Sequence, residues 1–249
     1  MMAMRGTCRA DVAPLLTSTR PSMSFALRLS RRTFAAAAVA LVAAGALGAQ
    51  PAAVSARRAV AATPAAPITP SDRWLDGLTS KHRQFFDGPT ANGGIMLVHI
   101  LNYYDTLNET YKVKDADIDA VGTFYGATVF YGVNDAMWAK YRIGEFVASI
   151  DPTAGKLGAE NPWRTTPVVL GMSLPQASVE TLLKRGATFI LCNNALTIFS
   201  GVLAKARGLD ADSVYNDLAS NILPGVNLIP GMVVAIEQAH TANMSYHRQ

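Results

Sequence analysis

Cys192 is the side chain of this sequence with the clearest capacity for chemistry. It closes an apolar run, residues 187–191, and precedes Asn193 and Asn194, where a helical pattern begins. A thiol at such a strand-to-helix junction lies near unpaired main-chain amides and the positive end of the helix dipole. These surroundings favour the thiolate, which is the nucleophilic form of cysteine. We therefore predict that Cys192 is the catalytic residue; the alternative is a buried cysteine that acts as a small apolar side chain.

Asn193 and Asn194 follow the thiol directly, and the sequence leaves two uses of their side chains open. Either one is a candidate substrate-binding residue that would orient the sulfur or a small oxyanion. Asparagine is also one of the preferred N-cap residues of helices, and capping is the ordinary role at such a position.

Asp87, Gly126 and Pro230 are further candidates for substrate binding, because each follows a predicted strand. The carboxyl ends of parallel strands lie at one edge of the sheet, where α/β domains bind their ligands. We therefore expect these three residues at the same edge as Cys192. Asp87 would act there as an acid, a base or a polar contact, unless it is only the turn residue of an Asp-Gly-Pro sequence.

The elements that must position these residues alternate between strands and helices. Strands are predicted at 82–86, 118–125, 187–191, 226–229 and 244–247, and helices at 94–111, 134–144, 176–185, 193–208, 210–222 and 232–242. Asn134 and Asp210 are the expected N-caps of two helices, and Gly186 is expected to end a third. This alternation predicts an α/β fold with a mostly parallel sheet of about five strands, covered by helices on both faces.

Residues 148–175 have no clear periodicity and contain several prolines and glycines. A segment of this length inside a compact domain is usually functional or makes an assembly contact. Trp163, which lies in this segment, is expected at a subunit interface or against a ligand, whereas Trp138 is expected in the core.

No metal or cofactor site is predicted. The four histidines, His82, His99, His240 and His247, include no pair at helical i,i+4 spacing. The Gly93-Gly94 pair lacks the spacing of a dinucleotide-binding motif, and there is no Gly-x-Ser-x-Gly sequence.

Residues 1–56 are predicted to be a twin-arginine signal peptide and are set apart from the fold. The pattern is Ser30-Arg31-Arg32-Thr33-Phe34, followed by an uncharged alanine-rich run. Met23 is a candidate for the true start, and cleavage would remove Cys8, which leaves Cys192 as the single thiol. An uncleaved membrane anchor is the alternative, although the run is short for the ~20 residues of a spanning helix. We expect a periplasmic or otherwise exported protein.

The basic character of the chain belongs to this leader. The sequence carries 22 Lys and Arg and 18 Asp and Glu; six of the former and one of the latter precede residue 57, so residues 57–249 have a net charge of −1. No basic surplus remains to indicate a nucleic-acid partner. Residues 57–70 are predicted to be an Ala/Pro-rich linker, and residues 71–249 a single domain.

The sequence resembles the DsrE/DsrF-like sulfur-relay proteins over about residues 81–246. The resemblance rests on residues 134–138, 141–145, 186–196, 223–226 and 231–238. It implies a three-layer α/β/α flavodoxin-like fold, assembly into homo-trimers or hexamers, and sulfur carried as a persulfide on a cysteine after the third strand, which is Cys192 here. The better-known family members are cytoplasmic, whereas this chain carries a predicted export signal and the additional segment 148–175.

Two functional hypotheses follow. The first is an exported sulfur carrier or sulfurtransferase-like protein that holds sulfane sulfur on Cys192, with a small sulfur species or a partner thiol protein as its partner. The second is a non-catalytic oligomeric binding or scaffold domain, in which the cysteine has only a structural role.

Overall fold

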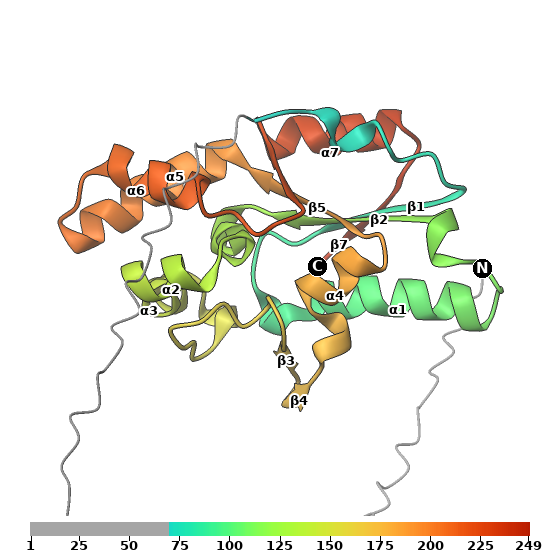
Figure 1. The fold of residues 1–249 in the computed structure, drawn as a ribbon, viewed down its shortest axis with the longest axis horizontal. Coiled ribbons are helices and arrows are strands. Elements are labelled where there is room, and N and C mark those ends of the chain that lie inside the picture. Colours follow the sequence, from blue (N-terminus) through green and yellow to red (C-terminus); the bar gives the residue numbers. More distant parts are fainter. Residues whose placement is uncertain (1–69) are drawn as a thin grey trace, which may run out of the picture. The chain divides into compact units, whose positions relative to one another are not determined.

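The computed structural model describes residues 70–249. The predicted signal peptide, Cys8, Met23 and the linker up to residue 69 lie outside this part of the chain. The described residues contain a five-stranded sheet covered by helices, which confirms the predicted α/β class and its three-layer α/β/α arrangement (Figure 1).

The main sheet is parallel at each of its four strand pairings. Its strands lie in the order β6-β5-β2-β1-β7. The bounds are β1 His82–Asp87, β2 Ile118–Phe124, β5 Thr188–Cys192, β6 Val226–Ile229 and β7 Ser245–Arg248. All seven residues of β2 are buried, and so are the last four of β5. Such continuous burial is typical of parallel strands that have helices on both faces.

The helices follow the predicted alternation. Their bounds are α1 Ile95–Glu109, α2 Asp135–Tyr141, α3 Ile143–Ile150, α4 Val179–Lys184, α5 Asn193–Arg207, α6 Ala211–Ala219 and α7 Met232–Thr241. Short 3-10 turns lie at Arg73–Leu75, Asn92–Gly94, Asp115–Asp117, Gly126–Gly132, Pro152–Ala154 and Pro175–Ala177. In Figure 1, α7 covers one face of the sheet, α1 and α4 lie against the other, and α5 and α6 pack together beyond the strand ends.

The structure confirms the predicted helix caps at Asn134 and Asp210 and the predicted helix end at Gly186. The Asn134 side chain accepts a hydrogen bond from the Met137 amide, and that of Asp210 accepts one from the Ser213 amide. Gly186 follows α4 with a φ of +102°, a conformation that favours glycine.

Two helix predictions need correction. The helix expected over 134–144 is two helices, because Arg142 adopts a left-handed conformation with φ 51° and separates α2 from α3. The helix expected at Gln176 begins at Val179, after the 3-10 turn at Pro175–Ala177, because the Ser178 side chain caps it by accepting from the Thr181 amide.

The segment 148–175 contains more structure than its sequence suggests. It holds the end of α3, a 3-10 turn and a short antiparallel pair, β3 Val168–Val169 and β4 Met172–Ser173. Between these strands Leu170 is 85% exposed, whereas Trp163 is 4% exposed. Trp163 therefore packs inside the described chain, on Tyr131, and the expectation that it lies at a subunit interface was wrong.

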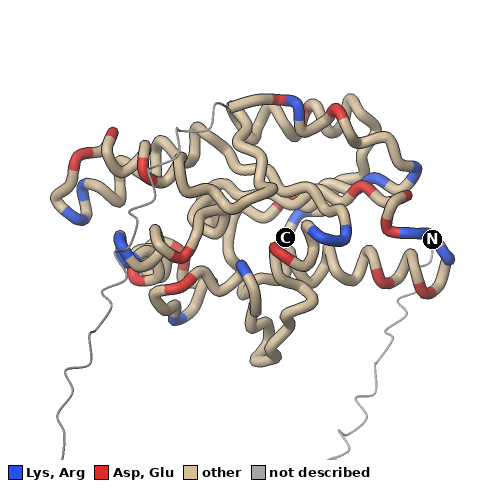
Figure 2. The backbone as a smooth tube through the Cα atoms, in the orientation of Figure 1, with Lys and Arg blue, Asp and Glu red and all other residues tan. Residues whose placement is uncertain are grey.

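Charged residues of both signs are interspersed along the described backbone (Figure 2). Between residues 70 and 249, none of the helices has both the length and the apolar character that crossing a membrane requires.

Candidate functional site

Cys192 ends β5 and is itself the N-cap of α5. Its Sγ accepts hydrogen bonds from two main-chain amides, that of Ala195 at 3.4 Å and that of Met232 at 3.3 Å. Ala195 lies in the first turn of α5, and Met232 is the first residue of α7. The amino-terminal ends of two helices therefore meet at one sulfur atom.

This meeting follows from the order of the sheet. β5 and β6 are neighbours, with Cys192 paired to Ile229 in the register. After β6 the chain passes through Pro230 and Gly231 into α7, so the start of α7 lies beside the end of β5. Two amide donors and two positive helix ends stabilise negative charge. On Cys192, the charge that they would stabilise is that of a sulfur anion.

The thiol is largely covered within a single chain, since Cys192 is 5% exposed. The surrounding surface is more open: Asn194 and Pro230 are exposed, and Val233 on α7 is 77% exposed.

Asn194 and Asn193 lie in different environments, and neither side chain caps α5, so the expected capping role was wrong. The Asn193 Oδ1 atom accepts a hydrogen bond from the Tyr215 hydroxyl at 2.7 Å, which joins α5 to α6. The Asn194 side chain lies close to Gly231, where an added Cβ would be 3.2 Å from Nδ2. The main-chain amide of Asn194 donates to the Pro230 carbonyl. Asn194 and Pro230 therefore belong to the surroundings of Cys192, whereas Asn193 faces away toward α6.

Gly126 lies at the carboxyl edge as expected, but it serves a close backbone contact. Its φ is +57°, and an added Cβ would be 2.8 Å from the Pro89 carbonyl oxygen. The turn after β2 and the turn after β1 therefore touch at this glycine, and a side chain would separate them.

Asp87 is the last residue of β1 and is 1% exposed, so it is a buried carboxylate rather than a turn residue. Its Oδ2 atom accepts a hydrogen bond from the Tyr246 hydroxyl, and its Oδ1 atom has no partner among the described residues. Burial, followed by this hydrogen bond, raises the pKa of Tyr246 to about 12. Because β2 lies between β1 and β5, Asp87 and Cys192 share an edge of the sheet but lie on strands that are not neighbours.

The fold brings together two histidines that the sequence does not relate. His247 on β7 and His99 on α1 approach to 3.1 Å between Nε2 and Nδ1. Burial and then the His99 ring lower the pKa of His247. Within residues 70–249, no group of three or more His, Cys, Asp or Glu side chains is placed to hold a metal ion.

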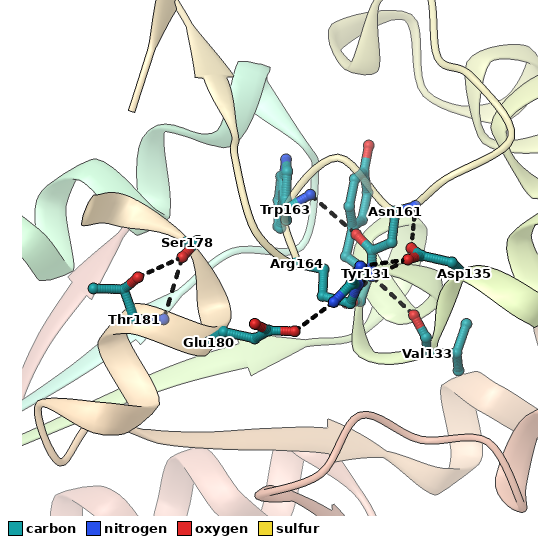
Figure 3. A network of polar contacts seen from close by, with 9 residues as sticks. All are labelled: Tyr131, Val133, Asp135, Asn161, Trp163, Arg164, Ser178, Glu180 and Thr181. Carbon is teal, nitrogen blue, oxygen red and sulfur yellow. Dashed lines mark hydrogen bonds and ion pairs between the residues drawn. The ribbon is translucent and has the colours of Figure 1, made fainter. Parts of the chain in front are cut away.

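A partly buried polar network fixes the segment 148–175 and was not predicted (Figure 3). The Asn161 Nδ2 atom donates to the carbonyls of Tyr131 and Val133, both at 2.8 Å, and its Oδ1 atom accepts from the Trp163 amide. Arg164 pairs with Asp135 at 2.7 Å and with Glu180 at 2.6 Å. An Asn-Pro-Trp sequence before an arginine was the only local signal of this network.

Comparison with known proteins gives no family assignment. No family model matches the chain, and no curated protein matches it. Among solved structures, one similar chain is a protein of unknown function from Methanobacterium thermoautotrophicum, with 18% sequence identity and a TM-score of 0.34. The match covers 68% of the present chain and all of the other one.

Proposed function

We propose that this protein is an exported sulfur carrier that holds sulfane sulfur as a persulfide on Cys192. The observation that supports the proposal is the pair of amide donors, from Ala195 and Met232, directed at the sulfur. A cysteine whose only role is to fill space needs no such donors, because a thiol is a weak acceptor.

The chemistry is a thiol–persulfide exchange. The Cys192 thiolate attacks the sulfane sulfur of thiosulfate, the S–S bond of thiosulfate breaks, and sulfite leaves with the bonding electron pair. The product is Cys192–S–S⁻. In the second step an acceptor thiolate attacks the outer sulfur, which returns the Cys192 thiolate and gives an acceptor persulfide. The amides of Ala195 and Met232 would stabilise the sulfur anion before loading and after transfer.

Sulfur loading is tested by intact mass after incubation of the full chain with polysulfide and removal of the excess. We expect one added sulfur atom on the wild type and on Cys8→Ser, and none on Cys192→Ser. Equal loading of wild type and Cys192→Ser would overturn the proposal, because the sulfur would then reside elsewhere.

The burial of Cys192 favours a second candidate, a non-catalytic binding or scaffold domain with a structural cysteine. The two candidates differ in the native reactivity of the thiol toward iodoacetamide. Alkylation of native Cys192 at a rate comparable to that of the unfolded chain supports the carrier. Alkylation that occurs only after unfolding supports the scaffold.

Assembly into a homo-oligomer, a trimer or a hexamer, belongs to the same proposal. α5 and α7, which hold the sulfur, expose Ile198 at 63% and Val233 at 77%. Light scattering should give a mass above that of one chain, and Val233→Glu should lower it while Leu170→Glu, on the distant β3–β4 pair, should not. A monomeric wild type would exclude the proposed homo-oligomer.

Export by the twin-arginine route is the last part of the proposal, and it rests on Ser30–Phe34. Replacement of Arg31 and Arg32 by lysine should retain the protein in the cytoplasm, as measured by cell fractionation. Unchanged export of this variant would contradict the assignment.

A further inference from the structure

His99 and His247 meet at the edge of the sheet, in a part of the fold that the proposed function does not use. His247 lies on the edge strand β7, and His99 lies on α1. The Nε2 atom of His247 and the Nδ1 atom of His99 are 3.1 Å apart, and the two ring planes are nearly perpendicular, at 87°. In the sheet, β2 and β1 lie between β5 and β7, so this pair is separate from Cys192.

Two histidine nitrogens this close together present at least one lone pair to the space between the rings. Both facing nitrogens cannot carry a proton, because two donors would then have no acceptor between them. A neutral imidazole carries its proton on either nitrogen, and when both protons are on the outer nitrogens, both facing atoms are acceptors. One facing proton gives a hydrogen bond, whereas no facing proton gives two nitrogen ligands for a metal ion.

The separation of the two nitrogens fits the coordination of a single ion. Histidine nitrogens bind Zn²⁺ at about 2.0 to 2.1 Å. With the nitrogens 3.1 Å apart, two such bonds form an angle of about 95 to 102° at the ion. This range lies between the ~90° of octahedral and the ~109° of tetrahedral coordination, so an ion could bind without a change in the separation.

A surface pocket of about 320 Å³ gives solvent access to the pair and supplies further polar groups. It is lined by Gln84, Phe86, His99, Asn102, Tyr103, Thr106 and His247. The lining contains no lysine or arginine that would repel a cation. Within residues 70–249 no third His, Cys, Asp or Glu joins the pair, so water and amide oxygens from the pocket wall would fill the remaining positions.

The two rings are held in place by the packing around them. The Phe86 ring contacts the His247 ring, with 5.8 Å between centroids, and the Tyr103 ring, with 5.7 Å between centroids. Phe86 and His247 are partners in the register of β1 and β7, and Tyr103 lies one turn after His99 on α1. A pair that is already positioned loses less entropy when it binds an ion.

We propose that His99 and His247 form a binding site for one divalent transition-metal ion that prefers nitrogen ligands, of which Zn²⁺ is the representative. The ion would be held by Nδ1 of His99 and Nε2 of His247, with water and the Gln84 amide oxygen completing its coordination. Because His99 is on α1 and His247 is on β7, the ion would join the edge strand to the helix beneath it. It would therefore stabilise the folded domain.

The test is calorimetric titration of the metal-free full chain with Zn²⁺. The two cysteines also bind zinc, so the titration is done on the Cys8→Ser, Cys192→Ser double variant, which also separates this site from the proposed sulfur carrier. We expect saturable binding of one ion per chain. His99→Gln and His247→Gln should each weaken it at least about tenfold, because loss of a group that only supports a metal ligand already costs about 10- to 100-fold.

His82→Gln on β1 and His240→Gln on α7 are the matched controls, and they should bind Zn²⁺ as tightly as the parent variant. Zn²⁺ should also raise the melting midpoint of the parent and of both controls, but not that of His99→Gln or His247→Gln, because the ion binds the folded pair. Mg²⁺ should have no such effect, since it prefers oxygen ligands.

Absence of Zn²⁺ binding would overturn the proposal. Equal affinity of the parent, His99→Gln and His247→Gln would also overturn it, because the ion would then lie elsewhere. Circular dichroism of each variant checks folding, and either glutamine variant alone keeps the test decisive if the other fails to fold.

Discussion

Replacement of Asn161 by alanine should destabilise the domain by several kcal/mol, although the residue lies in an irregular segment. Asn161 is 4% exposed, and its side chain makes three hydrogen bonds to the main chain. Alanine would leave two carbonyls and one amide without partners.

The magnitude follows from the cost of a buried polar group that loses its partner, ~1 to 3 kcal/mol. Water that enters the space left by the side chain will restore part of the loss for three such groups. We therefore expect a decrease in the free energy of unfolding of about 3 to 5 kcal/mol. For a domain of this size each kcal/mol lowers the melting temperature by about 2 to 4 °C, so the midpoint should fall by about 10 °C.

Urea denaturation followed by circular dichroism measures the change, with Asn216→Ala as the matched control. Asn216 lies on the exposed side of α6 and makes no side-chain hydrogen bond within residues 70–249, so its replacement should change stability by less than about 0.5 kcal/mol. Asn161→Asp keeps the shape but turns a carboxylate oxygen toward two carbonyls, so at neutral pH it should destabilise at least as much as alanine.

A loss below about 1 kcal/mol for Asn161→Ala would refute the reasoning. The segment 148–175 would then not be fixed by this side chain.

Three further predictions concern other parts of the fold. Tyr246→Phe removes the donor to the buried Asp87 carboxylate and should lower the free energy of unfolding by about 1 to 3 kcal/mol, measured in urea; no change would mean that the carboxylate finds another donor. Because the folded state lowers the pKa of His247, the unfolded chain binds the proton more readily; stability should therefore be full above about pH 6.5 and decline as the pH falls through the lowered value, and His247→Gln should flatten this dependence. Gly144→Ala should destabilise strongly, because its Cβ would overlap a main-chain carbonyl of the long segment, whereas Gly201→Ala, with open space around it, should stabilise by up to about 1 kcal/mol; thermal melts that rank the two variants in the opposite order would contradict the packing.

The elements of this fold were predictable where a local pattern determines them. The apolar run before Cys192 is a buried strand, as predicted. Asn134 and Asp210 cap helices because their side-chain oxygens accept hydrogen bonds from main-chain amides of the first helical turn. The break at Arg142 was not predictable, because a left-handed arginine inside an amphipathic pattern has no sequence signal.

The site was predictable only in part, because its geometry depends on contacts between distant residues. The position of Cys192 at a strand end follows from the sequence, but the Met232 amide reaches it from 40 residues away and requires β5 and β6 to be neighbours. His99 and His247 meet only because β7 lies beside β1, over α1. The stacking of Trp163 on Tyr131 likewise depends on how the long segment folds back.

The most direct test of the carrier function follows a single sulfur atom into and out of the protein. The full chain is loaded with polysulfide, and peptide mass mapping is done before and after addition of glutathione. The proposed function predicts an additional sulfur on the peptide that contains Cys192, followed by its loss and the appearance of glutathione persulfide. An unmodified Cys192 peptide, or an additional sulfur that glutathione does not remove, would contradict it.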